Sequence, residues 1–278
     1  MINLLVCKRL TADNQLLTEQ MLYQLTSKDT DKISYLFGTM HLQNEDAFTY
    51  KEQILAKIND CEAFATEFKL DEADEEKTTR YMNLPPGILL ETLLSKKKFA
   101  QIDSFLKSNL RIPLMAFNQS KPLVITNLIT TSIFQQDMEL ALDIYLYQYA
   151  KMQGKELLGI ETFDEQLEIL EKIPLELQVK SLKDLIKNFD QHRLEMNEIS
   201  QLYAEGKTKE LYKLAKKSAK GFRKIILYNR NAIMSERIAK LITEKSICVA
   251  IGAGHLEGKR GVIKGLEALD VKVEKVEI

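Results

Sequence analysis

The sequence predicts an α/β (α+β) fold, with a central mixed, partly parallel sheet built from the N- and C-terminal segments and a large helical middle. Apolar stretches near both ends, "SYLFG" and "CVAIG", are typical of buried strands that stop at glycine, and long helical periodicity fills the residues between them. At 278 residues the chain is near the upper limit for one hydrophobic core, so we predict a single domain over residues 1–278. The sheet-forming segments are 15–70, 150–162 and 245–278, and the mainly helical insertions are 75–150 and 164–245.

The first segment predicts a hairpin followed by a βαβ unit. A strand over 21–24, the polar turn "TSKDTDK" and a strand over 33–37 form the hairpin. Residues 46–60 carry apolar side chains at helical spacing, and "CEAFATEF" then returns to a strand pattern. Because a helix crosses over between them, the two strands that flank it are expected to be parallel.

The rest of the chain is mainly helical, with three further strands. The breaks "LPPG" and "SKP" divide the first insertion, and a helix over 138–152 ends at a glycine before a strand over 156–160. The second insertion is interrupted mainly by Pro174. A strand over 247–251, a helix over 262–269 and the terminal strand "VKVEKVEI" complete the sheet.

Composition disfavours several functional classes. The net charge is −1 at pH 7, so no global field attracts nucleic acid or anionic lipid. Cys7, Cys61 and Cys248 form neither a metal-binding nor a disulfide pattern, and we predict that they are buried apolar residues. No stretch approaches the roughly 20 apolar residues that span a bilayer, and the N-terminus lacks the pattern of a signal peptide. We therefore expect a cytoplasmic protein that binds no nucleic acid.

Four predicted strands each lead to a side chain that can do chemistry: His41, Glu67, Glu161 and His255. Ligands bind at the carboxyl ends of parallel strands, so these residues are expected to meet at one edge of the sheet. Imidazole and carboxylate suit zinc, manganese, cobalt or iron. A catalytic ion would need about three of these ligands and an open position for water, and the fourth group would act as general base. The sequence does not decide which glutamate takes which role.

Glycines follow the two strands that lead to the histidines. We expect Gly38, Gly252 and Gly254 to adopt positive φ and to bring a cofactor or ligand close to backbone N–H groups. The spacing of "GAGHLEGKRG" fits neither the dinucleotide-binding nor the phosphate-binding glycine motif.

The helix "LYNRNAIMSERI" supplies two further candidates for cofactor binding, Arg230 and Asn231. Polar residues of this kind more often lie on a helix surface. His192 lies in a helix and carries no strand-end pattern, so we predict a structural role for it.

Several segments occur in the order seen in a known family: "SYLFGTMHL", "ATEF", "LPPGILLETLL", "KELLGIETFDEQL", "LYNRNAIMSERI" and "VAIGAGHLEGKRG". From about residue 15 to the C-terminus the chain resembles the TraB/GumN/Tiki family. The resemblance implies a fold similar to erythromycin esterase and the haem-binding ChaN proteins. Tiki members are metal-dependent proteases whose activity manganese or cobalt supports. For this chain, the resemblance implies a site made of His41, His255 and Glu67. Glu161 and Arg230 match family positions without an assigned role.

Residues and resemblance together predict a metal-dependent hydrolase, in particular a peptidase. His41, His255 and Glu67 would hold a divalent cation (Mn, Co or Zn) that activates water, with Glu161 as a further catalytic carboxylate, and the substrate would be a peptide or a small molecule. The alternative is a non-catalytic protein that binds haem or a peptide through the same strand-end residues. A purely structural helical interaction protein is the third interpretation.

Overall fold

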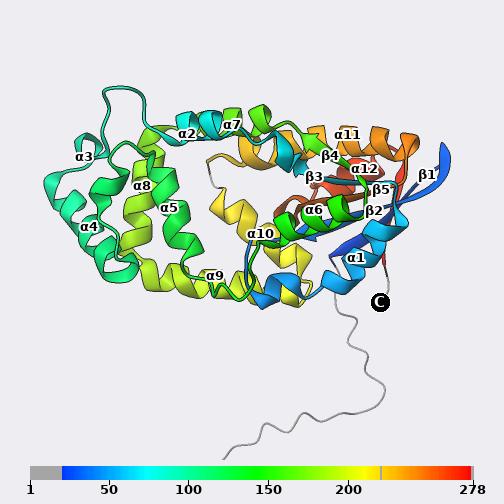
Figure 1. Cartoon of the computed structure of the whole chain (residues 1–278), viewed down its shortest axis with the longest axis horizontal. Coiled ribbons are helices and arrows are strands. Elements are labelled where there is room, and N and C mark those ends of the chain that lie inside the picture. The colour runs from blue at the N-terminus through cyan, green and yellow to red at the C-terminus, as the bar shows by residue number, and fades with distance from the viewer. Residues whose placement is uncertain (1–20, 220, 277–278) are drawn as a thin grey trace, which may run out of the picture.

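The computed structural model describes residues 21–219 and 221–276, and its centre is a six-stranded mixed sheet in the order β4-β3-β5-β2-β1-β6 (Figure 1). The strands are β1 (Leu22–Ser27), β2 (Thr30–Thr39), β3 (Ala63–Phe68), β4 (Glu156–Glu161), β5 (Ile247–Gly252) and β6 (Val271–Lys275). β4, β3, β5 and β2 run parallel, while β1 pairs antiparallel with β2 and β6. The predicted mixed, partly parallel sheet is confirmed; residues 15–20 of its first predicted segment lie outside the described residues.

Helices make up most of the two insertions. The helices are α1 (Lys51–Asp60), α2 (Glu75–Met82), α3 (Leu90–Leu93), α4 (Lys96–Leu110), α5 (Pro122–Thr131), α6 (Leu142–Met152), α7 (Phe163–Glu171), α8 (Leu175–Lys187), α9 (Phe189–Ala204), α10 (Thr208–Ser218), α11 (Arg230–Glu244) and α12 (Val262–Glu267). The predicted helical character of both insertions is confirmed, and Pro174 is the N-cap of α8. The helix predicted over 138–152 is shorter, because residues 138–141 are not helical.

The hairpin strands are longer than predicted. β1 and β2 stay paired as far as Ser27 and Thr30, so only Lys28 and Asp29 remain between the strands. The turn is therefore shorter than the predicted "TSKDTDK". The β-branched threonines of this segment favour extended backbone, and their side chains are partly buried.

The βαβ unit is present, with β5 inserted between its two strands. α1 connects β2 to β3, and each strand pairs with β5 in parallel orientation, which confirms the predicted orientation. The helix predicted over 46–60 is interrupted near its start. There, Asn44 caps a separate 3₁₀ helix, η1 (Glu45–Phe48), by accepting a hydrogen bond from Ala47 N–H.

Helices cover both faces of the sheet (Figure 1). On one face, α11 packs through Met234, Ile238 and Ile242, which recur every four residues and are at most 2% exposed. On the other face, α1 and α6 contribute Ile58 and Leu146 to a second core. The central strands β2, β3 and β5 are buried on both sides along most of their length, which explains their nearly continuous apolar sequences.

A third core lies in the helical region at the end of the molecule away from the sheet (Figure 1). It joins α4, α5 and α8 through residues such as Leu106, Ile125 and Leu182, none of which is exposed. Cys61 and Cys248 are buried free thiols, as predicted, and Cys7 lies outside the described residues. Within the described part of the chain, no helix is both long and apolar enough to cross a bilayer.

Candidate functional site

The four predicted strand-end residues follow one another along one edge of the sheet. Because β4, β3, β5 and β2 are consecutive and parallel, Glu161, Glu67, His255 and His41 occur in that spatial order. β2 and β5 end at the same level, since Thr39 pairs with Gly252.

Arg230, the first residue of α11, joins three of these residues. Its Nη2 donates to Glu67 Oε2 and to Glu161 Oε2 at 2.6 Å each, and its Nε donates to Glu161 Oε1 at 3.0 Å. Its Nη1 lies 3.3 Å from His255 Nε2. All four side chains are at most 13% exposed, so Arg230 belongs to a buried ionic network and does not lie on the helix surface.

The network keeps Glu67 ionised and Arg230 protonated. Burial alone would raise the pKa of Glu67, but the nearby His255 and Arg230 side chains and the Gly252 N–H, 2.8 Å from Oε1, hold it below its usual range. Burial would lower the pKa of Arg230, but its bonds to Glu161 and Glu67 raise it above its usual value. The cluster therefore contains a guanidinium shared by two side chains from adjacent strands.

Asn231 orients His255. The Asn231 amide nitrogen donates to the Arg260 carbonyl at 2.7 Å, so its Oδ1 accepts from His255 Nδ1–H, 2.6 Å away. The lone pair of His255 is then on Nε2, which accepts from Arg230 Nη1–H and also faces Glu67. Burial lowers the pKa of His255 despite the nearby Glu67 charge, so the imidazole is neutral at neutral pH, and Arg230 is the lasting positive charge beside Glu67.

His41 lies outside these contacts and pairs with Asp143 of α6. His41 Nδ1 is 2.7 Å from Asp143 Oδ2, which has no other partner among the described residues. The Asp143 carboxylate is 10% exposed and the His41 side chain 64% exposed. The charge of Asp143 raises the pKa of His41 to about 9, so His41 carries a proton at neutral pH in this arrangement.

Sequence reasoning missed Asp143. The only local signal is an acidic residue on an otherwise apolar stretch, "LALDIYLYQY", where a charge would usually point to solvent. Gln166 was also missed: its amide donates to Glu67 Oε2 and Glu161 Oε2 at 3.2 Å each.

The three predicted glycines do not have positive φ, contrary to expectation. Gly252 has φ −54° and uses its N–H for Glu67. A Cβ on Gly38 would lie 2.6 Å from Leu256 Cδ1, and one on Gly254 would lie 2.9 Å from Ala215 Cβ. These positions require small residues because protein atoms pack against them, and the prediction that they bind a cofactor stays a prediction.

A π-helix, η4 (Lys224–Asn229), leads directly into Arg230. π-Helical turns inside longer helices often occur at functional sites. Here the turn precedes the residue on which the whole ionic network depends.

Glu165 and Arg237 form a second ion pair near the network, with a testable pH dependence. Two hydrogen bonds of 2.7 Å from Arg237 are the main reason that the pKa of Glu165 falls from 4.5 to about 2. The resulting stability is present above pH 4.5 and is lost as the pH falls through 2. Because both side chains are more than a third exposed, we expect Arg237→Ala to lower the free energy of unfolding at pH 7 by less than about 1 kcal/mol.

Urea unfolding at pH 7 and at pH 2.5 would measure this effect. The difference between wild type and Arg237→Ala should shrink at the lower pH. Arg193→Ala removes a more exposed arginine whose ion pair is 3.5 Å long, and should change neither value. A difference for Arg237→Ala that is the same at both pH values would contradict the assignment.

Two of the predicted metal ligands face each other. His255 Nε2 is 3.9 Å from Glu67 Oε1, and two ligands of one tetrahedral ion at about 2.0–2.1 Å would lie roughly 3.4 Å apart. A neutral imidazole and an ionised carboxylate suit a divalent transition metal. Among the described residues, no three His, Cys, Asp or Glu side chains are grouped closely enough to hold an ion. The third predicted ligand, His41, is turned to Asp143.

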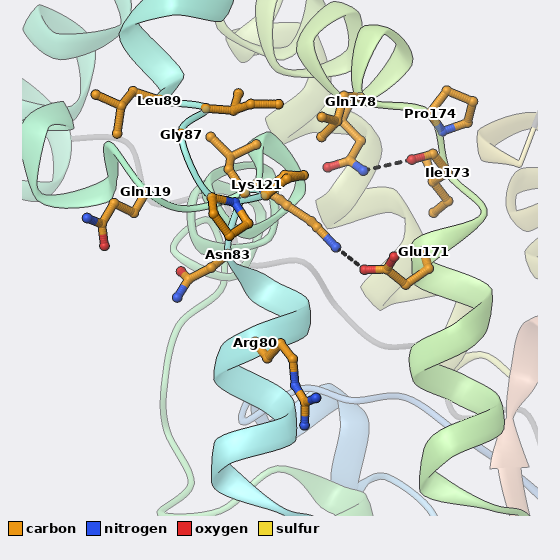
Figure 2. A pocket seen from close by; sticks show the side chains of 15 residues that line it. Arg80, Asn83, Gly87, Leu89, Gln119, Lys121, Glu171, Ile173, Pro174 and Gln178 are labelled. Carbon is orange, nitrogen blue, oxygen red and sulfur yellow. Dashed lines mark hydrogen bonds and ion pairs between the residues drawn. The ribbon is translucent and has the colours of Figure 1, made fainter.

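Two cavities differ in their relation to this cluster. A cavity of about 630 Å³ lies in the helical region between α2, the loop before α3 and the α7–α8 connection (Figure 2). Figure 2 shows Lys121 pointing toward Glu171 and Gln178 bonded to the Ile173 carbonyl. No predicted site residue lines it. A smaller cavity of about 250 Å³ is lined by Glu161 and Arg230 and therefore adjoins the strand-end cluster.

A mixed, partly parallel sheet between helical layers, with a buried polar cluster at its parallel strand ends, defines an α/β protein whose candidate site lies where such folds bind ligands. The chain belongs to the TraB/PrgY/gumN family, whose pattern matches residues 21–275. This match confirms the family resemblance over nearly the whole chain. Neither a curated protein nor a solved structure matches the sequence.

Proposed function

We propose that this protein is a metal-dependent hydrolase, and in particular a peptidase, with its site at the shared edge of β4, β3, β5 and β2. The observation that supports this most is the arrangement of His255. Its Nδ1 is held by Asn231, and its Nε2, which would exchange its bond from Arg230 for the metal, faces Glu67. A histidine fixed through one nitrogen by a hydrogen-bond acceptor is typical of metal ligands.

His41, His255 and Glu67 would hold the divalent cation, which would be manganese, cobalt or zinc. Such an ion lowers the pKa of a bound water and polarises a carbonyl group. To become a metal ligand, His41 would have to lose the proton that the negative charge of Asp143 stabilises on its imidazole.

The other residues of the cluster have roles of their own. Arg230 fixes the carboxylate of Glu67 and places a positive charge beside the position where a peptide carbonyl oxygen would become negative. Glu161, with a side chain that is 2% exposed, accepts two donors of the same guanidinium and holds its plane. We therefore assign metal binding to Glu67 and positioning to Glu161.

Metal analysis with matched histidine variants tests this proposal. Protein prepared without chelator and equilibrated with Mn²⁺, Co²⁺ or Zn²⁺ should retain about one ion per chain after desalting, whereas His41→Ala and His255→Ala should retain much less. His192→Ala is the control, because His192 contacts Thr130 in the helical region. Equal metal content in all four proteins would reject the metal site. Metal binding without hydrolysis of any peptide in a diverse mixture would reject the peptidase.

A further inference from the structure

The smaller cavity beside the cluster has an apolar wall. Ile169 of α7, Ile225 of η4 and Ile233 of α11 line it together with Arg230 and Glu161. All three isoleucines are partly exposed, and Ile233 is 38% exposed. Sites for whole small molecules occupy roughly 300–1,000 Å³, so a cavity of about 250 Å³ suits a single side chain.

The π-helix explains how one segment supplies both an apolar wall and a charged one. In a π-helix, hydrogen bonds join residues five apart, so the chain turns less per residue than in an α-helix. Ile225 and Arg230 are five apart, at the start and just beyond the end of η4, and both line the cavity. In an α-helix, with 3.6 residues per turn, they would point in different directions.

The charges around the cavity nearly compensate one another. Arg230 is bound to Glu161, and Glu165 is bound to Arg237. At the rim, Glu168 and Lys172 have opposite charges four residues apart on the α7 side. Glu67 shares Arg230 with Glu161, so a small negative balance remains, which disfavours an acidic ligand, and the isoleucines offer the contacts for an apolar one.

We propose that this cavity is a specificity pocket for an aliphatic side chain of the substrate, that of valine, leucine or isoleucine. This inference rests on the proposed function, because the pocket shares Arg230 and Glu161 with the proposed site. Burial of a leucine-sized side chain contributes about 1.5–3 kcal/mol. Ligands with this side chain should therefore bind about tenfold or more tightly than their glycine counterparts.

The absence of tryptophan from the chain allows a direct binding test. Lys172→Trp and Asn229→Trp each place one fluorophore at the rim of the cavity and keep all three isoleucines. In both variants, N-acetyl-leucinamide should change the fluorescence saturably, and N-acetyl-glycinamide should require about tenfold or higher concentration. Adding Ile225→Asp should abolish the preference. Leu194→Trp carries its single tryptophan on an exposed site of α9 and should not respond.

The same response to both amides, or a response from Leu194→Trp as large as from the pocket variants, overturns the inference. Cleavage of a peptide mixture by the wild type then separates it from the proposed function. Selective binding of the leucine amide without any hydrolysis keeps the pocket and rejects the peptidase. Hydrolysis with no preference for aliphatic side chains near the cleaved bond keeps the peptidase and rejects the pocket.

Discussion

Replacing Arg230 by alanine is expected to lower the free energy of unfolding by about 3–5 kcal/mol, because it leaves two buried carboxylates without their shared partner. Glu67 and Glu161 are 12% and 2% exposed, and Arg230 donates to both. Urea unfolding monitored by circular dichroism at pH 7 measures the loss. In the variant a buried carboxylate gains stability by binding a proton, so the deficit should become smaller as the pH falls toward 5.

Arg237→Ala is the matched control for this experiment. Arg237 lies on the same helix and makes a comparable pair with Glu165, but both side chains are more than a third exposed. Its loss should cost less than about 1 kcal/mol. Equal losses for the two variants would show that the Arg230 network does not stabilise the fold through buried charge.

Replacing Glu67 by glutamine is expected to reduce peptide hydrolysis by about 10²–10⁴-fold, the range typical of losing a group that takes part in the reaction. The glutamine oxygen can still accept from Gly252 N–H, and Arg230 keeps its bonds to Glu161, so the local fold should survive. The negative charge beside His255 is lost. The measurement is kcat/KM on a cleaved peptide, with circular dichroism as a check of folding.

Glu156→Gln is the control for Glu67→Gln. Glu156 is a carboxylate of β4 bonded to Lys245, but it lies at the start of the strand, away from the cluster at the strand ends. Its activity should stay within about twofold of the wild type. Full activity in Glu67→Gln would remove Glu67 from the proposed mechanism, while loss of folding would point to a structural role only.

Most of the fold could be predicted because its signals are local. Apolar strands that end at glycine, helical periodicity and breaks such as Pro174 depend on neighbouring residues, and the strands and helices occur nearly where they indicate. The errors lie at boundaries. The hairpin turn is shorter than predicted, and a capped 3₁₀ helix after Asn44 replaces the predicted start of α1. Pairing and capping depend on a few specific hydrogen bonds.

The candidate site was predicted only in part. The strand-end rule found Glu67, Glu161 and His255, because adjacent parallel strands end at one edge of the sheet. It did not show that one arginine binds both glutamates, because Arg230 is 163 residues from Glu67 and has the local pattern of a helix surface. Asp143 was missed for the same reason: its pairing with His41 is visible only after α6 packs on the sheet.

By itself, the sequence determined the family, the mixed sheet and which strand ends carry the candidate residues, since these follow from local patterns and chain direction. The tertiary structure alone decided which charges meet. It placed Arg230 between two glutamates, turned His255 toward Glu67 through Asn231, and turned His41 toward Asp143. The physical reason is that a buried charge is stable only beside a partner, and the partners here come from segments that folding alone brings together.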